Sequence, residues 1–276
     1  MGRGLDYLGK YRIIRMVRSG HTCQIFEAMD DFDHKKFAIK ALVPEQRKNK
    51  EEIKALQHEL TVAKDFDHEN VIEVYEIGTD GSVYFLVLEL SPHPNLKLMI
   101  RNNFELALYR APTIIEQVFV SLGYMNDQGW VHSDVKPDNF LVSDEGDIKL
   151  IDFAISEKIR TGFSKWFASK PRIQGTMSYM SPEQIEGLKI DSRADLYSLG
   201  VIFYQLLAGK TPFSATTLIQ LLRQQADHEP PPLSELARDK APEDFYLLIH
   251  RLLEKKPDKR PQTAKDLQEQ LEAILA

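Results

Sequence analysis

The sequence predicts an α+β chain with two lobes, a small one made mainly of antiparallel strands and a larger one made mainly of helices. In residues 1–90, short runs rich in Val, Ile, Phe and Tyr alternate with Gly, Asp and Asn turns, which is the pattern of β-strands. Pro92 and Pro94 then interrupt the chain, and the segments beyond them have the apolar spacing of helices. We therefore predict one domain over 1–276, with a hinge just before Pro92 that separates lobes 1–90 and 91–276.

The small lobe is expected to combine several strands with one main helix. The strands are expected over Tyr11–Arg18, Cys23–Met29, Phe37–Leu42, Val71–Gly78 and Val83–Glu89. Asp80-Gly81 lies between the last two strands and favours a tight hairpin turn. The helix is expected over Lys50–Asp65, where apolar residues recur at helical spacing. Glu59 lies only about 60° from Leu56 around that helix, so a carboxylate borders a buried face and needs a partner of opposite charge.

The large lobe is expected to consist mainly of helices, over Tyr109–Gln128, Ser192–Gly209, Leu218–Gln225, Glu243–Glu254 and Thr263–Leu275. Gly129 and Gly209 stand at the ends of the first two helices, where glycine commonly terminates a helix. Between these helices, Phe140–Val142 and Ile148–Ile151 are strand-like and are joined by a turn at Asp144–Asp147.

Composition excludes several classes of protein. Of the 276 residues, 43% are hydrophobic and 28% are charged, as in ordinary globular domains. The formal net charge of −6 argues against a protein that binds nucleic acid. The lone cysteine, Cys23, excludes an internal disulfide and a cysteine-rich zinc site, and it fits a reducing compartment.

Neither membrane insertion nor secretion is expected. No uninterrupted apolar run reaches the roughly 18 residues that span a bilayer, and the longest candidate, Leu196–Ala208, contains Gln205 and suits a buried helix. The N-terminal residues lack the apolar segment of a secretory signal. We therefore expect a cytoplasmic protein, and the sequence contains no feature that indicates dimerisation.

The densest group of polar residues runs from His132 to Asn139, between a predicted helix and a predicted strand. Phosphoryl transfer from ATP requires a carboxylate that accepts the hydroxyl proton, a cation beside the phosphates, and oxygen ligands for Mg²⁺. Asp134 offers the carboxylate and Lys136 the cation. Asn139, together with Asp152 after the next strand, offers the metal-binding oxygens.

On these residues the sequence resembles the protein kinase family over nearly its whole length. Residues 132–139, HSDVKPDN, are similar to HRDxKxxN of the family, and residues 152–154, DFA, are similar to DFG. Residues 37–40, FAIK, and 181–183, SPE, resemble VAIK and APE. Single residues at further family positions are Glu59, Asp195 and Arg260. Because these strings occur in family order and spacing, the resemblance implies the two-lobed protein-kinase fold.

The resemblance implies a role for each catalytic position. Lys40 is expected to hold the α- and β-phosphates of ATP and to be positioned by Glu59. Asp134 is expected to accept the hydroxyl proton, and Lys136 to neutralise charge on the transferred group. The implied metal ligands for Mg²⁺, with Mn²⁺ as an alternative, are Asn139 and Asp152.

The resemblance also implies a nucleotide site. Leu88 stands at the gatekeeper position, and the backbone from Glu89 to Ser91 is expected to bond adenine. The full set expected around the nucleotide is Val17, Arg18, Ser19, Gly20, His21, Thr22, Cys23, Gln24, Ile25, Ala38, Lys40, Leu88, Glu89 and Ser91.

Other matching residues are expected to support structure. Glu183 and Arg260 resemble a buried ion pair, Asp195 is expected to hold the backbone of the 132–139 loop, and His132 to pack inside. The DxKPxN form, with Gly175-Thr176 and Tyr179 before SPE, resembles serine/threonine kinases, including many bacterial ones. The implied activity is transfer of the ATP γ-phosphate to Ser and Thr hydroxyls of protein substrates, including the kinase itself.

The phosphate-covering loop departs most from the family. Where the family has GxGxxGxV, this chain has RSGHTCQI, so only Gly20 matches. Because glycines let the backbone approach phosphates, Arg18 and Cys23 are expected either to reduce ATP affinity or, through Arg18, to add a cation near the nucleotide. Cys23 itself is either a reactive thiol or a small residue in a glycine position.

Two further departures concern regulation. Ala154 replaces the glycine of DFG, which limits flipping of that segment. Ser133 replaces the arginine that, in the family, grips a phosphorylated activation loop, so the chain is of the non-RD type. We hypothesise that its activity depends little on phosphorylation of that loop.

The activation segment, residues 152–183, is basic, and either favours acidic substrates or is a solvated run of charge. Its aromatic residues either dock a partner or pack against the large lobe; they are Phe163, Trp166 and Phe167.

For the whole chain, two functions stay open: an active kinase, and a pseudokinase that binds ATP and acts as a scaffold. Phosphorylation of a small molecule is a weaker third reading.

Overall fold

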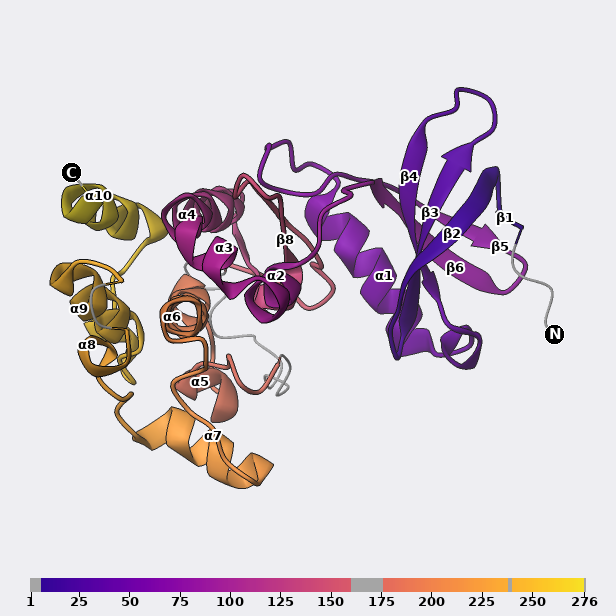
Figure 1. The fold of residues 1–276 in the computed structure, drawn as a ribbon. Helices are drawn as coiled ribbons and strands as arrows, with labels where there is room; N and C mark the ends of the chain where they lie inside the picture. The colour runs from indigo at the N-terminus through magenta and orange to yellow at the C-terminus, as the bar shows by residue number, and fades with distance from the viewer. Residues whose placement is uncertain (1–5, 160–175, 238–239, 276) are drawn as a thin grey trace. The chain divides into compact units, whose positions relative to one another are not determined.

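Contacts among residues 6–159, 176–237 and 240–275, which a computed structural model describes, divide the chain into two units (Figure 1). The first unit holds the residues up to Pro92 together with Asp152–Ala154. The second unit holds His93–Ile151 and the chain from Ile155 onward.

The first unit contains a six-stranded sheet in the order β1-β2-β3-β4-β6-β5, with antiparallel neighbours throughout. The strands are β1 Tyr7–Leu8, β2 Tyr11–Ser19, β3 Cys23–Asp30, β4 Lys36–Leu42, β5 Val74–Asp80 and β6 Val83–Glu89. The five predicted strands are thus confirmed, and β1 was missed because it spans only two residues. β5 begins three residues later than predicted, because the N–H of Val71 donates to the carbonyl of His68 and closes a turn there.

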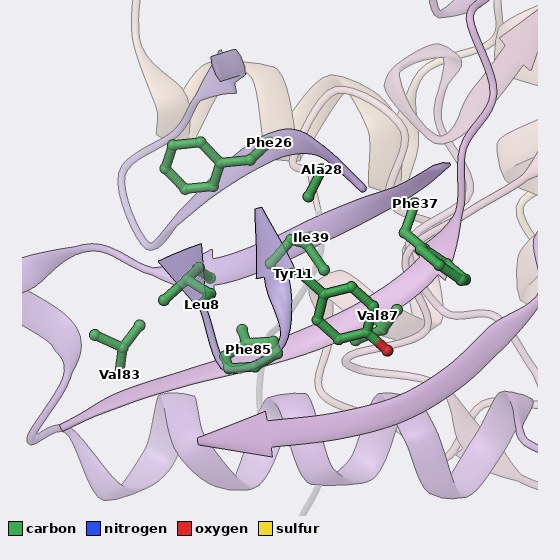
Figure 2. Close-up of a cluster of buried hydrophobic side chains, with 10 residues drawn as sticks. Leu8, Tyr11, Phe26, Ala28, Phe37, Ile39, Val83, Phe85 and Val87 are labelled. Atoms are coloured by element: carbon green, nitrogen blue, oxygen red, sulfur yellow. The ribbon is translucent and has the colours of Figure 1, made fainter. Parts of the chain in front are cut away.

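Alternation along the strands places a core on one side of the sheet. Figure 2 shows the buried cluster, whose members are Leu8, Tyr11, Phe26, Ala28, Phe37, Ile39, Ala41, Val83, Phe85 and Val87. Phe37, Ile39 and Ala41 all come from β4, and successive side chains of a strand point to opposite faces. Since Phe37, Ile39 and Ala41 face the core, Lys40 lies on the opposite face of the sheet.

The helix of this unit, α1, spans Lys50–Ala63 and packs against β5 and β6. Asn49 begins it, because its side chain accepts a hydrogen bond from the N–H of Glu51 and satisfies an amide that has no partner within the helix. Leu56, Glu59 and Val62 are buried on one side. The predicted helix is confirmed, and Glu59 lies on its buried face rather than at the edge.

The second unit is mainly helical, as predicted. Its helices are α2 Leu96–Asn102, α3 Phe104–Tyr109, α4 Ala111–Asp127, α5 Pro182–Ile185, α6 Ser192–Ala208, α7 Leu218–Asp227, α8 Leu233–Leu236, α9 Glu243–Leu252 and α10 Ala264–Leu275. Two small antiparallel pairs accompany them, β7 Trp130–Val131 with β10 Glu157–Lys158, and β8 Phe140–Val142 with β9 Ile148–Leu150. None of the described helices is both long and apolar enough to cross a membrane.

The predicted helix over Tyr109–Gln128 is wrong at its start. The chain forms α3 up to Tyr109 and begins α4 at Ala111, because Pro112 lacks an N–H and is tolerated only in the first turn of a helix. Helices α2 and α3 were not predicted from the sequence. Their signals are the side chains of Asn95 and Asn103, which accept hydrogen bonds from the N–H groups of Leu98 and Leu106.

Helix α6 lies at the centre of this unit and is buried along nearly its whole length. It packs against α4, where the rings of Phe119 and Phe203 meet edge-to-face with centroids 5.2 Å apart. Gly209 ends it with a φ of 73°, a left-handed conformation that glycine adopts without strain. The interpretation of Leu196–Ala208 as a buried helix is therefore confirmed.

We expect Gly200→Ala and Gly123→Ala to change stability in opposite directions. A Cβ at Gly200 would lie 2.8 Å from the Cβ of Leu252, so we expect overpacking to lower the free energy of unfolding by about 1–3 kcal/mol. A Cβ at Gly123 would lie 3.5 Å from the Cβ of Ala264, an ordinary contact. There the better helix propensity of alanine should raise stability by about 0.5–1 kcal/mol. Urea unfolding of both variants measures this, and shifts of the same sign would contradict it.

Candidate active site

Lys40 and Glu59 form a buried ion pair in the first unit. β4 turns Lys40 away from the apolar cluster, and α1 presents Glu59 from its buried side. Lys40 Nζ lies 2.6 Å from Glu59 Oε2, with only 15% and 1% of the two side chains exposed. The carboxylate that the sequence placed on an apolar helix surface thus has the partner that its burial demands.

Asp152 approaches the same lysine from a distant part of the sequence. Its Oδ1 accepts a hydrogen bond from Lys40 Nζ at 2.9 Å, and its backbone has a left-handed φ of 70°. The next residue, Phe153, is fully buried and meets the ring of Phe66 edge-to-face at 5.6 Å. Its N–H also bonds the Glu59 carboxylate. Packing of Phe153 therefore holds Asp152 beside Lys40 in a backbone conformation that is unfavourable for aspartate.

The electrostatics of this cluster keep Lys40 charged. Burial disfavours its ammonium form, but the carboxylates of Asp152 and Glu59 outweigh burial and hold the pKa of Lys40 above its ordinary value. Burial also raises the pKa of Glu59, and the Lys40 ammonium opposes that rise. The cluster thus presents a fixed cation, which suits binding of a polyphosphate.

The residues expected to cover the nucleotide form the β2–β3 hairpin. Val17, Arg18 and Ser19 end β2, Gly20, His21 and Thr22 make the turn, and Cys23, Gln24 and Ile25 begin β3. The N–H of Gly20 donates to the carbonyl of Cys23 at 2.9 Å, which closes the turn. Ile25 is paired with Lys40 on the neighbouring strand, so the hairpin leads directly to the lysine.

Two residues expected around adenine are direct neighbours. Ala38 on β4 is paired with Leu88 on β6, two pairs along from Lys40 and Leu86 and on the same face of the sheet as Lys40. Glu89 follows Leu88, and its N–H donates to the carbonyl of Glu73 at 2.9 Å. This contact uses the N–H of Glu89, and binding of adenine by the backbone from Glu89 to Ser91 stays a prediction. Ser91 belongs to the same unit, beyond the end of β6.

Asp134 is the centre of a second cluster, in the second unit. Its Oδ2 accepts from Lys136 Nζ, and its Oδ1 accepts from the N–H of Thr176 at 2.8 Å. Asn139 Nδ2 donates to the Asp134 carbonyl at 2.9 Å. Among the described residues, none donates a hydrogen bond to Asn139 Oδ1. An amide oxygen of this kind can serve as a ligand to a hard cation such as Mg²⁺.

The loop that carries Asp134 is held by a buried carboxylate. Asp195, in the first turn of α6, accepts from the N–H groups of His132 and Ser133 at 2.8 and 2.9 Å. Burial raises the pKa of Asp195 to about 6, although His132 and the two N–H groups oppose that rise. His132 is fully buried, and its Nδ1 accepts from the N–H of Asp134 at 3.3 Å. These contacts are those that the resemblance implies for Asp195 and His132.

Glu183 and Arg260 form the expected buried ion pair. Arg260 Nη1 and Nη2 lie 2.7 and 2.8 Å from the two carboxylate oxygens of Glu183. Arg260 also donates to the backbone carbonyls of Arg193, Glu254 and Lys255. All five N–H groups of the Arg260 guanidinium thus have acceptors, and these contacts connect α5 with α6 and with the chain before α10.

The predicted catalytic residues therefore form two clusters, one in each unit. Lys40, Glu59 and Asp152 meet in the first, and Asp134, Lys136 and Asn139 in the second. In the described parts of the chain, no group of three or more His, Cys, Asp or Glu side chains forms a metal site. Mg²⁺ needs only one or two protein oxygens when phosphates supply the others, and each cluster holds an oxygen of the kind that it prefers, Asp152 in the first and Asn139 in the second.

Sequence reasoning missed several groups of the second cluster. Thr176 was noted only as part of a motif, but its N–H bonds Asp134 directly. Gln184 was missed, although Ser181 followed three residues later by Gln is a recognisable capping box. The left-handed φ of Ser133, 70°, had no sequence signal, because serine does not favour that region.

The predictions for the central activation segment lie outside the described residues. They concern the basic residues Arg160, Lys165, Lys170 and Arg172 and the aromatic and hydroxyl residues Phe163, Trp166, Phe167, Thr161, Ser164 and Ser169. The remaining basic residue, Lys158, is described and is exposed in β10.

Comparison with known proteins identifies the family that these clusters resemble. A family profile described as the protein kinase domain matches residues 11–271. A probable serine/threonine-protein kinase of Clostridium acetobutylicum is 29% identical over 265 residues, which cover 96% of this chain and 40% of that protein. Serine/threonine-protein kinase PrkC of Bacillus subtilis is 28% identical over 260 residues, which cover 94% of this chain and 40% of that protein.

For a third relative, the match covers a larger share of the relative's own length. Serine/threonine-protein kinase PknL of Mycobacterium tuberculosis is 29% identical over 265 residues, which cover 96% of this chain and 65% of that protein. The chain thus spans about two-fifths of the length of the Clostridium and Bacillus relatives. The resemblance to serine/threonine kinase domains, bacterial ones included, is confirmed.

We expect Cys23 to be a poor nucleophile. Burial raises the pKa of its thiol to about 11, with Lys40 opposing that rise. At pH 8 its thiolate fraction should be about 200-fold below that of a thiol with a pKa of about 8.5. Iodoacetamide should therefore label the folded chain about 200-fold more slowly than the urea-unfolded chain. The folded rate should keep rising up to about pH 11, and a plateau below about pH 9 would contradict the prediction.

Proposed function

Because the chain belongs to the protein kinase family, we propose that it is a serine/threonine kinase that phosphorylates protein substrates, its own chain included. The arrangement of Asp134 carries this proposal: one carboxylate oxygen meets the Lys136 ammonium and the other an N–H of the segment before α5. A module that only binds ATP has no need of a carboxylate held in this way. The relatives described above are serine/threonine-protein kinases, which supports serine and threonine as acceptors.

The proposed cofactor is ATP with Mg²⁺, for which Mn²⁺ is an alternative. When bound, ATP would supply the phosphoryl group, and the metal ion would neutralise the negative charge that develops on the phosphates. Lys40, charged and held by Glu59, would contact the phosphates, and Asn139 and Asp152 would bind the metal. Ala38 and Leu88 would line the adenine site, since they pair across β4 and β6.

The chain's own residues then carry out two tasks. Asp134 accepts the proton of the substrate hydroxyl at its carboxylate, and the Lys136 ammonium beside it stabilises negative charge on the transferred group. Asn139 and Asp195 fix the backbone on both sides of Asp134, which preserves the geometry on which proton transfer depends.

One observation favours the alternative function, a pseudokinase that acts as an ATP-binding scaffold. In the β2–β3 hairpin, side chains occupy positions where the family has glycine, Arg18 and Cys23 among them. They restrict the approach of the backbone to phosphates. The intact clusters around Lys40 and Asp134 outweigh this feature, because the chemistry depends on them.

The proposed site of action is the cytoplasm. The one cysteine is a free thiol, which fits a reducing compartment, and no described helix can span a membrane.

We expect Asp134→Asn to abolish phosphoryl transfer. The amide cannot accept the hydroxyl proton, so kcat should fall by about 10²- to 10⁴-fold while ATP binding persists. Labelled γ-phosphate is followed on the chain itself and on a generic basic protein, with Mg²⁺ and then with Mn²⁺. Asp144→Asn, an exposed change of the same type in the β8–β9 turn, is the control and should retain activity. ATP binding without transfer by the unaltered chain would establish the pseudokinase.

We also expect loop phosphorylation to be dispensable. The backbone of Ser133 is held by Asp195, and serine has no cation with which to grip a phosphate. Simultaneous replacement of Thr161, Ser164 and Ser169 by Ala should therefore leave kcat within about twofold of the unaltered chain. Phosphatase-treated protein provides a second comparison. A collapse of activity in either sample would show that the non-RD hypothesis is wrong.

A further inference from the structure

Gln184, on the short helix α5, joins two segments of the second unit. Its Nε2 donates to the backbone carbonyl of Ser133 at 2.8 Å. Its Oε1 accepts from the N–H and the hydroxyl of Ser181, at 3.0 and 3.2 Å. Only 8% of Gln184 is exposed, and both ends of its amide are thus used in a buried environment.

The carbonyl that Gln184 holds belongs to a strained residue. Ser133 has a φ of 70°, a conformation that a non-glycine residue keeps only where its surroundings enforce it. Its N–H is fixed by Asp195, and its carbonyl is fixed by Gln184. That carbonyl is part of the peptide group joined to Asp134, whose own N–H donates to His132 Nδ1. Both edges of the peptide group before Asp134 are therefore held, one of them by Gln184.

A second bridge joins the same two segments. Asp134 Oδ1 accepts from the N–H of Thr176, which lies a few residues before Ser181 and α5. The two bridges and the chain between them close a ring that contains Asp134, Thr176, Ser181, Gln184 and Ser133. Rotation of the Ser133–Asp134 peptide would break the Gln184 bridge and displace the Asp134 carboxylate from Thr176.

We propose that Gln184 is a positioning residue, which sets the orientation of Asp134 through the Ser133 carbonyl. The inference rests on the proposed kinase activity for its effect on rate, but not for its effect on structure. The bridge is made by a neutral amide, so it forms without any phosphate on the activation segment. It thus supplies a link between the Asp134 loop and the segment before α5 that needs no arginine at position 133.

The substitution Gln184→Glu distinguishes the two roles of the Gln184 side chain, which accepts hydrogen bonds from Ser181 and donates one to Ser133. The introduced carboxylate can still accept from Ser181, as Glu does in a capping box, so α5 keeps its start. It cannot donate to the Ser133 carbonyl while ionised. Once protonated, its O–H can donate again. The substitution therefore removes only the bridge, and removes it only above the pKa of the introduced group.

The kinetic test measures kcat and KM for ATP between pH 6 and 8. At pH 8 we expect kcat of Gln184→Glu to fall by about 100-fold, because misplacement of the base slows transfer, with KM within about twofold. Relative to the unaltered chain, kcat should recover as the pH falls, since burial raises the pKa of the introduced carboxyl. Gln184→Ala should lose as much activity at every pH. A pH-independent ratio for Gln184→Glu would overturn the proposal.

The matched control is Gln220→Glu. Gln220 occupies the same position in α7 that Gln184 has in α5, the third residue after the N-cap, and its N–H bonds the side chain of that cap, Thr217. It is exposed and its substitution adds the same charge. Activity and pH profile should match those of the unaltered chain, so that an effect confined to Gln184 reports the bridge.

Hydrogen exchange tests the bridge without reference to activity. The amides of Ser133 and Thr176 donate to Asp195 and Asp134, and loss of the bridge should speed their exchange by about tenfold or more at pH 8. If the unaltered chain shows no transfer, the proposed function fails, but faster exchange in Gln184→Glu still supports the bridge. Unchanged exchange would overturn it. If Gln184→Glu does not fold, Gln184→Ala tests the same bridge through a loss of kcat at every pH and through faster exchange of the two amides.

Discussion

A charge that is removed from water must be compensated, and three such charges hold this structure together. Glu59 is buried against Lys40, Arg260 against Glu183, and Asp195 against two backbone N–H groups. Each compensation joins segments that are far apart in sequence. Because removing one partner of a buried pair commonly costs about 3–5 kcal/mol, these contacts fix the helices and loops to which they belong. These contacts therefore also determine where the proposed functional residues lie.

The two clusters depend on these charges in different ways. In the first unit, the lysine is both the structural partner of Glu59 and the proposed phosphate ligand, so that one ammonium serves stability and function. In the second unit the tasks are divided. Asp195 and Gln184 hold the backbone of Ser133, and the proposed proton transfer falls to the carboxylate of Asp134. Substitutions in the first cluster are therefore expected to combine losses of stability and of activity, whereas the second cluster allows the two to be separated.

Much of this arrangement could be predicted from sequence, and the exceptions have physical reasons. Helical spacing marked Glu59 as a carboxylate beside a buried face, and the resemblance to the kinase family supplied Lys40 as its partner. Helices α2 and α3 are too short for periodicity to stand out. The contacts of Thr176 and Gln184 involve backbone groups, which carry no residue-specific signal. The left-handed φ of Ser133 and Asp152 arises from tertiary packing rather than from local preference.

The burial of Cys23 has a consequence for redox chemistry. Peroxides oxidise thiolates rather than thiols, and the first product is a sulfenic acid. Burial raises the pKa of the Cys23 thiol to about 11, so little thiolate forms at physiological pH, and we expect peroxides to oxidise this sulfur of the β2–β3 hairpin slowly. The same property makes Cys23 a poor anchor for electrophilic inhibitors, whose selectivity for this hairpin would have to come from shape and non-covalent contacts alone.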